Sequence, residues 1–340
     1  MKYSIGYQLP DDYDSTYELC SDYKDNISSV YFSFANEPGG RMPLCADDEE
    51  SVKEVSAYQL EELCAIRGLG IDLTLLLNAN CYGENANTSE FAERIIVLCN
   101  HLKTAADITS VTTTSPFIAK KIKKRFGNDI SVTASVNMRV DSINTMQQLT
   151  RDFDGFYIRK ELNRNLGAIS EMKKWCDENG KKLFILANSG CLDHCGFQTY
   201  HDNLVAHHKY MQRSEESFPA PCWEYLYGMP SLDAMGKILS SNWIRPEDVK
   251  RYAPYFSEMK LATRMHSSPR RVLSAYVRES FAGNVMDLTE PSYSSLFKGY
   301  ILDNTLFPTD WFEVTSSCDK NCYKCSYCKE VAKYIRQKYE

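Results

Sequence analysis

Residues 108–136, ITSVTTTSPFIAKKIKKRFGNDISVTASV, contain the pattern on which the fold prediction rests. Two short runs rich in β-branched residues, 108–114 and 130–136, flank a longer stretch, 116–126, that begins with a proline. β-Branched runs are typical of strands, and proline is favoured at the first position of a helix. This part of the chain therefore predicts a strand, a helix and a second strand in succession.

The same alternation extends over most of the chain. The predicted strands are 3–9, 29–34, 71–78, 108–114, 130–136, 155–159, 182–188 and 259–263. The predicted helices are 49–68, 89–103, 116–126, 142–151, 166–179, 199–213 and 246–255. Eight strands, most of them followed by a helix, predict an α/β fold of the (β/α)8 TIM-barrel type, with a doubly wound sheet as the alternative.

The end of the chain has a different character. A predicted helix at 269–280 leads into a loop-rich stretch, 283–308, then a cysteine-rich segment and a charged final helix at 329–339. We therefore expect a barrel domain at residues 1–267 and a C-terminal, cysteine-rich, metal-binding extension at residues 268–340.

Composition limits the classes of function. The chain has 340 residues, of which 43% are hydrophobic and 25% charged, which is typical of a globular protein. A net charge of −6 argues against broad, nonspecific binding of nucleic acid but leaves a local basic groove open. There is no apolar run long enough to span a membrane, and the first residues, MKYSIGYQLPDDYD, lack the apolar segment of a secretory signal. We expect a cytoplasmic protein.

A barrel of this type carries its functional residues at the C-terminal ends of its strands. Polar residues gather at those positions in the predicted strands. They are Asn78, Asn80, Cys81, Tyr82, Ser135, Asn137, Arg159, Lys160, Glu161, Asn188, Arg264 and His266. Arg159 suits an anionic substrate group because its planar guanidinium can bind a carboxylate with two hydrogen bonds. Glu161 and His194 are candidates for moving protons.

Cysteine usage indicates metal binding. The chain has 13 cysteines, and in a cytoplasmic protein a metal explains such a number better than disulfides do. Cys191 and Cys195 follow the seventh predicted strand, and Cys222 lies further along the chain. Three thiolates favour zinc, copper(I) or an iron–sulfur cluster. The fourth ligand stays open: Cys45, Cys81, a C-terminal cysteine or an open position for substrate.

A second group of cysteines crowds the segment CDKNCYKCSYC, residues 318–328. Cys318, Cys322, Cys325 and Cys328 resemble the ligand run of a ferredoxin-type loop more than a zinc ribbon, which splits its ligands between two loops. The segment predicts a second metal centre, an iron–sulfur cluster with zinc as the alternative.

Several stretches resemble the peptidase U32 family, whose better-understood members are ubiquinone-pathway and RNA hydroxylation proteins. The stretches are SVTASVNMRVDS (131–142), GFYIRKELNRN (155–165), NSGCLDHC (188–195) and NWIRPEDVKRYAPYFSEMKLATR (242–264). Together with Cys222 they extend the resemblance over roughly residues 1–280. The chain departs from the family pattern in two places: Lys160 stands between the signature arginine and glutamate, and no cysteine follows Cys222 within the next forty residues.

The resemblance implies a barrel-like α/β fold in which Cys191, Cys195 and Cys222 match three ligands of a [4Fe-4S] cluster. It also implies that Arg159 and Glu161 match charged residues near the pocket. The leading interpretation is a redox enzyme with one or two [4Fe-4S] clusters that hydroxylates or otherwise oxidises a small-molecule or peptide substrate, and that meets an electron donor or protein partner. The alternatives are a zinc-dependent hydrolase or peptidase, and a non-catalytic iron–sulfur subunit of a modifying complex.

Overall fold

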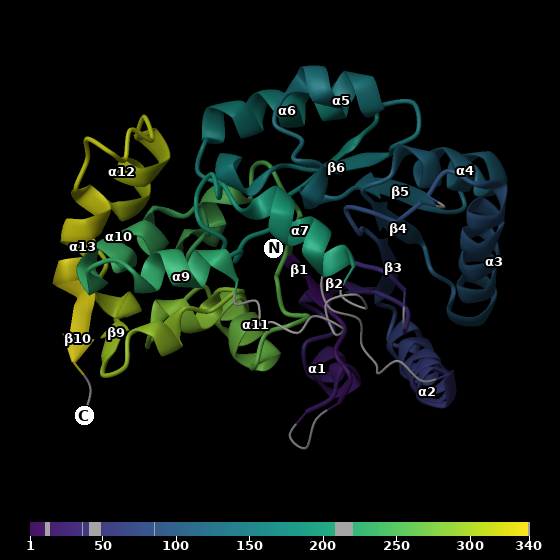
Figure 1. Cartoon of the computed structure of the whole chain (residues 1–340), viewed down its shortest axis with the longest axis horizontal. Helices are drawn as coiled ribbons and strands as arrows, with labels where there is room; N and C mark the ends of the chain where they lie inside the picture. Colours follow the sequence, from purple (N-terminus) through teal and green to yellow (C-terminus); the bar gives the residue numbers. More distant parts are fainter. Residues whose placement is uncertain (11–13, 36, 41–48, 85, 208–219, 339–340) are drawn as a thin grey trace.

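A barrel of eight parallel strands forms the centre of the computed structural model, which describes residues 1–10, 14–35, 37–40, 49–84, 86–207 and 220–338 (Figure 1). The strands are β1 (Lys2–Gly6), β2 (Ile27–Phe32), β3 (Asp72–Leu77), β4 (Ser110–Thr113), β5 (Ser131–Ala134), β6 (Gly155–Tyr157), β7 (Lys182–Phe184) and β8 (Glu258–Lys260). Consecutive strands from β1 to β7 are neighbours, and β8 pairs with β1.

The barrel closes where the chain continues beyond β7 and meets β8. Leu186 forms a parallel bridge with Lys260, whose N–H donates to the carbonyl of Ile185 at 3.0 Å. The N–H of Ala187 donates to the carbonyl of Lys260 at 2.9 Å. These contacts satisfy backbone groups that an open sheet would leave unpaired. The predicted TIM-barrel-like fold is confirmed, and the doubly wound sheet is excluded.

Helices between the strands cover the outside of the barrel. They are α1 (Thr16–Asp22), α2 (Glu49–Gly68), α3 (Ser89–Ala106), α4 (Pro116–Phe126), α5 (Ile143–Leu149) and α6 (Leu166–Glu178), with short 3-10 helices η1 (Val136–Met138) and η2 (Lys160–Leu162). Local signals set their limits. Ser115 caps α4 by accepting a hydrogen bond from the N–H of Ile118 at 3.3 Å, and Gly127 ends it at a φ of 55°. Ile118 and Ile122 of α4 then pack into the barrel core.

The chain between β7 and β8 is long. It contains α7 (Gln198–Ala206), α9 (Pro221–Tyr227), α10 (Ser231–Ser240) and the 3-10 helix η3 (Pro246–Tyr252). After β8 follow α11 (Pro269–Arg278), η4 (Val285–Leu288), η5 (Ser294–Leu296), β9 (Tyr300–Leu302), η6 (Asn304–Leu306), α12 (Trp311–Ser317), α13 (Tyr327–Ile335) and β10 (Arg336–Lys338).

Some predicted elements differ from the structure. The stretch 246–255 is the 3-10 helix η3 and ends at Tyr252, since Pro254 has no N–H with which to continue the helical hydrogen bonds. The final helix, expected at 329–339, gives way after Ile335 to β10, which pairs antiparallel with β9. That pairing joins two distant segments, so no local pattern reveals it. Of the predicted helix 199–213, residues 208–213 lie outside the described residues.

A second hydrophobic core lies beside the barrel, where α9 and α10 meet α13 (Figure 1). It includes Leu192, Met235, Trp311 and Ile335. Gly236 lets α10 and α13 approach closely, because a Cβ there would lie 3.0 Å from the Cα of Lys329. This core combines residues from both sides of the expected boundary at 267/268, and the division into two domains stays a prediction.

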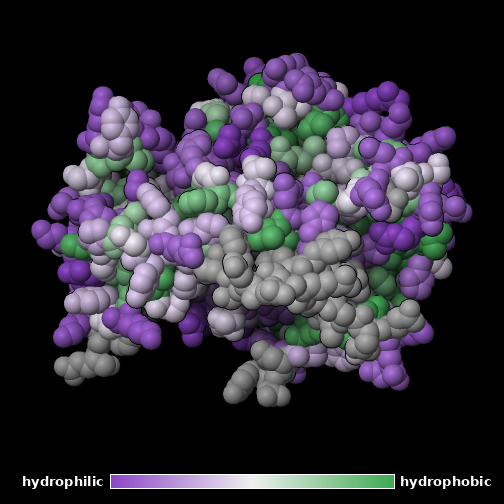
Figure 2. Space-filling view, in the orientation of Figure 1, coloured by the Kyte–Doolittle hydropathy of each residue, from purple (hydrophilic) through white to green (hydrophobic). Residues whose placement is uncertain are grey.

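The hydropathy of one face of the molecule shows no boundary between the barrel and the region of the second core (Figure 2). Hydrophilic and hydrophobic residues are interspersed over the face shown in Figure 2. Among the helices in the described ranges, none is both long enough and apolar enough to cross a membrane.

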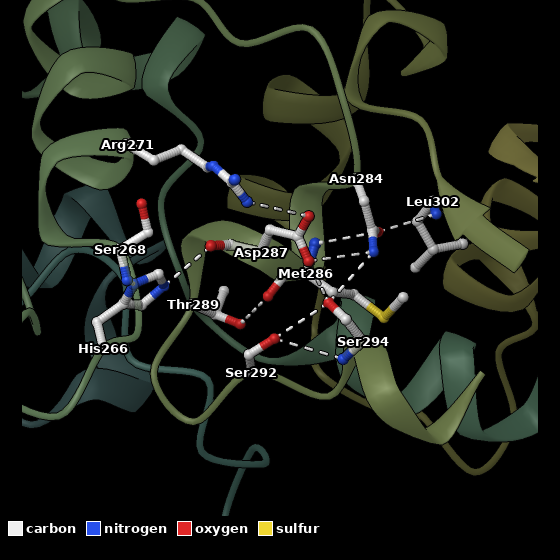
Figure 3. A network of polar contacts seen from close by, with 10 residues as sticks. All are labelled: His266, Ser268, Arg271, Asn284, Met286, Asp287, Thr289, Ser292, Ser294 and Leu302. Carbon is white, nitrogen blue, oxygen red and sulfur yellow. Dashed lines mark hydrogen bonds and ion pairs between the residues drawn. The ribbon is translucent and has the colours of Figure 1, made fainter. Parts of the chain in front are cut away.

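A buried polar network joins the end of β8 to the C-terminal segment (Figure 3). His266 is 6% exposed; its Nδ1 accepts a hydrogen bond from the N–H of Ser268, and its Nε2 donates to the carbonyl of Asp287, both at 2.9 Å. The side chain of Asp287 in turn accepts hydrogen bonds from Asn284 and Ser294. Because Nδ1 must accept, the folded state holds His266 in its neutral form, and burial lowers its pKa.

This network predicts a pH-dependent contribution to stability. A histidine whose pKa is lowered on folding stabilises the protein above its unfolded pKa of about 6.5, and this stabilisation is lost as the pH falls through the folded value. A His266→Asn variant, which keeps an acceptor but cannot titrate, should be destabilised by about 1–3 kcal/mol at pH 7.5 through imperfect hydrogen bonds. Between pH 7.5 and pH 5, urea denaturation should show a smaller loss of stability for the variant than for the wild type. Equal losses in both proteins would contradict the prediction.

Candidate functional site

The loop that carries Cys191 is positioned by the closure of the barrel. Asn188 is fully buried; its Nδ2 donates to the carbonyls of Ala262 at 3.1 Å and Leu288 at 2.8 Å, and its Oδ1 accepts from the N–H of Ala262. Two residues later, the N–H of Gly190 donates to the carbonyl of Glu290 at 2.9 Å. The polar end of strand β7 is therefore used to fasten three backbone segments together, and Cys191 follows directly.

Cys191, Cys195 and Cys222 line one cavity of about 210 Å³, which we call the cysteine cavity. Cys191 and Cys195 come from the loop after β7, and Cys222 comes from the first turn of α9. The three thiols lie close enough for their charges to influence one another. The structure thus brings together the three cysteines that the sequence separates by up to thirty residues.

The surroundings of these thiols are partly apolar. The hydroxyl of Tyr293 donates a hydrogen bond to the Sγ of Cys222 at 3.8 Å. Burial is the main cause that raises the pKa values of the Cys195 and Cys222 thiols. A catalytic cysteine nucleophile requires the opposite shift, toward the thiolate. These thiols therefore suit ligands, which a metal deprotonates, better than free nucleophiles.

Lys160 also lines the cysteine cavity, although it is only 7% exposed. Its Nζ donates to the Oε1 of Gln198 at 3.2 Å and lies 3.8 Å from the Oε1 of Glu161. Lys160, which stands between Arg159 and Glu161 in the sequence, is therefore the cation that faces the three thiols from the end of β6. A cation there offsets negative charge on the sulfurs.

Helix α7 connects the cysteine cavity to the mouth of the barrel. Asp202 of α7 lines this cavity, and its carboxylate accepts a hydrogen bond from the Nδ2 of Asn80, just beyond β3, at 3.2 Å. Arg139, beyond β5, lies 3.6 Å from the same carboxylate and donates to Thr199 at 3.1 Å. Asn80, which is among the residues predicted at strand ends, and Arg139, which is not, therefore hold α7 over the mouth.

Arg159 and Glu161 line a different cavity, the polar cavity, which has a volume of about 640 Å³ and also includes Asp141, His194, Cys318 and Lys320. Arg159 donates to Glu161 at 3.1 Å and to Asp141 at 3.3 Å. Burial by itself would raise the pKa of Glu161, but the charge of Lys160 and the hydrogen bond from Arg159 outweigh it, so the pKa is lowered. Glu161 is therefore ionised at neutral pH. Its predicted role in proton transfer and that of His194 stay predictions.

The C-terminal cysteines lie on the far side of the loop that carries Cys191 and Cys195. An intervening cavity of about 420 Å³ is lined by Cys195 on one side and by Lys320 and Cys322 on the other. Asn242 links the two sides, because it donates to the Oδ1 of Asp193 at 2.5 Å and accepts from the Nζ of Lys320 at 2.6 Å. Cys195 and Cys322, which are more than a hundred residues apart in the sequence, thus line the same cavity.

The fit of these sites to a metal depends on the spacing of the ligands. Within the described ranges, no group of three or more His, Cys, Asp and Glu side chains could hold a single metal ion. Thiolates around one zinc ion lie about 3.8 Å apart, whereas a cluster distributes its cysteines over several irons. Cys191, Cys195 and Cys222 share one cavity, and three thiols are a donor set that suits either zinc or an iron–sulfur cluster.

The fourth ligand of the cysteine cavity stays open. Cys45 lies outside the described residues, and Cys81 does not line the cavity. His201, Asp202 and Glu290 do line it. Sequence reasoning did not identify Tyr293 or Trp223 as site residues. Trp223 is adjacent to Cys222 and offered a local signal, whereas Tyr293 reaches the cavity only through tertiary packing.

A scan against protein-family models found no match. Comparison with known proteins found one similar sequence and one similar fold that bear on the family. The chain is 30% identical over 326 residues to the protein named Uncharacterized protease MJ1657 from Methanocaldococcus jannaschii, and the alignment covers 93% of this chain and 91% of that protein. Its fold is similar to that of the U32 peptidase Mk0906, with a TM-score of 0.54, 12% identity, and coverage of 77% of this chain and 92% of that chain.

The loop of Cys191 offers a matched pair of substitutions. A Cβ at Gly190 would lie 2.1 Å from the carbonyl oxygen of Pro291, whereas a Cβ at Gly196 would have no atom within 4 Å. Gly190→Ala should lower the free energy of unfolding by about 1–3 kcal/mol and displace Cys191, while Gly196→Ala should stay within about 0.5 kcal/mol of the wild type. Urea denaturation and the metal content of both variants test this. Two variants of equal stability would contradict the packing described here.

Proposed function

The chain belongs to the peptidase U32 family, and we propose that it is an iron–sulfur enzyme that hydroxylates or otherwise oxidises a substrate at the mouth of its barrel. One observation carries this proposal. Cys191, Cys195 and Cys222 converge on a single, partly apolar cavity beside the C-terminal ends of the strands. In a TIM barrel that end of the molecule carries the active site.

Cys191, Cys195 and Cys222 would hold a [4Fe-4S] cluster, which supplies one-electron redox chemistry when bound. Four protein residues would set its environment. Lys160 offsets the negative charge of the thiolates, and the hydroxyl of Tyr293 donates to the Sγ of Cys222. Leu192 and Trp223 line the cavity with apolar surface and limit the access of water. Hydrogen bonds and solvent exclusion are the means by which a protein adjusts such a centre.

The substrate would bind between this site and the polar cavity. Arg159 faces the polar cavity with a side chain that is 24% exposed, and its partner Asp141 is 45% exposed. An anionic group of a small molecule or peptide would replace Asp141 as the partner of the guanidinium. Glu161 would keep Arg159 in place, because its Oε2 accepts a hydrogen bond from Arg159. The side chain of Glu161 is only 5% exposed, so that contact is held by the surrounding structure.

A second candidate function is peptide hydrolysis. The observation in its favour is that both similar proteins bear the names of peptidases or proteases. A peptidase with a zinc centre would contain stoichiometric zinc and no iron, with an open coordination position for water.

The test begins with protein purified without oxygen. We expect iron and sulfide in the wild type, and a Cys191→Ser, Cys195→Ser double variant should lose about four irons and four sulfides per chain. Cys64→Ser is the matched control, because Cys64 is an exposed thiol on α2 outside the cysteine cavity. Circular dichroism shows whether the variants remain folded.

Two results would overturn the redox proposal. One is a folded double variant that retains the full iron content of the wild type. The other is colourless wild-type protein that contains zinc, takes up no cluster on anaerobic reconstitution and cleaves fluorescently labelled casein, which would establish the peptidase instead.

A further inference from the structure

The segment between α12 and α13 has no role in the function proposed above. Helix α12 ends at Ser317, and α13 begins at Tyr327 with Cys328 in its first turn. Between them the chain makes a tight turn in which Lys320 adopts a φ of 58°, a left-handed conformation that is uncommon for a residue with a side chain. A hydrogen bond from the N–H of Lys324 to the carbonyl of Asn321 at 3.0 Å closes a turn within the cysteine run.

Three of the four thiols of this run lie close enough for a charge on one to act on another. The charges of Cys318 and Cys322 both act on Cys328, and that of Cys318 acts on Cys322. The fourth thiol, Cys325, is exposed and accepts a hydrogen bond from the N–H of Tyr327 at 3.5 Å. Hydrogen bonds from backbone N–H groups to sulfur are one of the features that adjust iron–sulfur centres.

A buried arginine lies next to these thiols. Arg164 is 4% exposed, donates to the carbonyls of Leu239 at 3.2 Å and Trp243 at 2.9 Å, and lies over the rings of Trp243 and Trp311. The carboxylate of Asp248 acts electrostatically on it. Burial of an uncompensated guanidinium is costly. Negative charge on Tyr252, Cys328, Asp248 or Cys318 would favour its ionised form.

A second cation approaches from the turn itself. The Nζ of Lys320 points to Asn242 rather than to solvent and lines both the polar cavity and the intervening cavity. Two inward-facing cations therefore surround a set of thiols that carry no charge when protonated. Metal coordination would deprotonate the thiols and so place negative charge beside both cations.

We propose that Cys318, Cys322, Cys325 and Cys328 hold a second iron–sulfur cluster, with Arg164 and Lys320 as its compensating cations. The crowding of four cysteines into eleven residues favours a cluster over zinc, because zinc ribbons divide their ligands between two loops. The proposal does not depend on the cluster of the cysteine cavity, since it uses other cysteines. The link from Asp193 through Asn242 to Lys320 places the second centre beside the first.

The experiment measures iron, sulfide and zinc in the full-length chain, purified without oxygen, for separate sets of variants. The double variant Cys322→Ser, Cys325→Ser should lose about four irons per chain, and the double variant Cys191→Ser, Cys195→Ser should lose the other four. A variant with all four substitutions should contain no iron. Cys64→Ser again serves as the control. If the first double variant does not fold, Cys325→Ser alone gives the answer, because an exposed thiol can be replaced without disturbing a core.

The two proposals fail separately. Loss of iron only in the variant of the cysteine cavity would overturn the second cluster and leave the first. Loss of iron only in the C-terminal variant would do the reverse. Loss of one zinc and no iron from the C-terminal variant would show a structural zinc site and overturn the cluster there.

The role of Arg164 has its own readout. In the Cys191→Ser, Cys195→Ser background, a redox titration followed by electron paramagnetic resonance reports on the C-terminal cluster alone. Arg164→Met should shift its midpoint potential downward, because a buried positive charge stabilises the more negative, reduced cluster. Arg164→Lys should restore the wild-type potential. A potential that neither substitution changes would overturn the assignment of Arg164 as a compensating charge.

Discussion

The hydrogen bonds of Asn188 are the constraint on which the rest of the structure depends. This fully buried amide fastens the end of β7 to Ala262 and Leu288 at the same time. A buried amide that lost these partners would pay the full cost of desolvation, so the three segments have to stay in register. Gly190 and Cys191 follow within three residues, and the position of the cysteine cavity is thereby fixed relative to the barrel mouth.

A second constraint, the burial of apolar surface, explains why the two groups of cysteines are neighbours. The chain leaves the barrel after β7, builds α9 and α10, and returns at β8, and the segment after β8 must cover the apolar face that α10 exposes. Helix α13 does so, with close contact at Gly236. That packing carries Cys328 and Lys320 to Asn242 and so to the loop of Asp193. Burial of apolar surface, rather than attraction between the cysteines, positions the C-terminal run.

Much of the barrel could be predicted because its signals are local. The limits of α2 and α4 agree with the sequence pattern, and Ser115, Pro116 and Gly127 mark the ends of α4. Elements that depend on distant partners could not be predicted in this way. Strand β10 forms only because β9 lies beside it, and Tyr293 becomes a site residue only because its segment packs on Cys222.

The sequence by itself indicated the barrel, because strand periodicity is a property of contiguous residues, and it indicated the family through the resemblance of several short motifs. It also singled out Cys191, Cys195 and Cys222, whose convergence on one cavity the fold then showed. Tertiary structure alone decided which charged side chain faces which cavity. Lys160 turns toward the three thiols while Arg159 turns toward Asp141, although they are adjacent in the chain. Successive side chains at a strand end point in different directions, and only the packed neighbours determine what each of them meets.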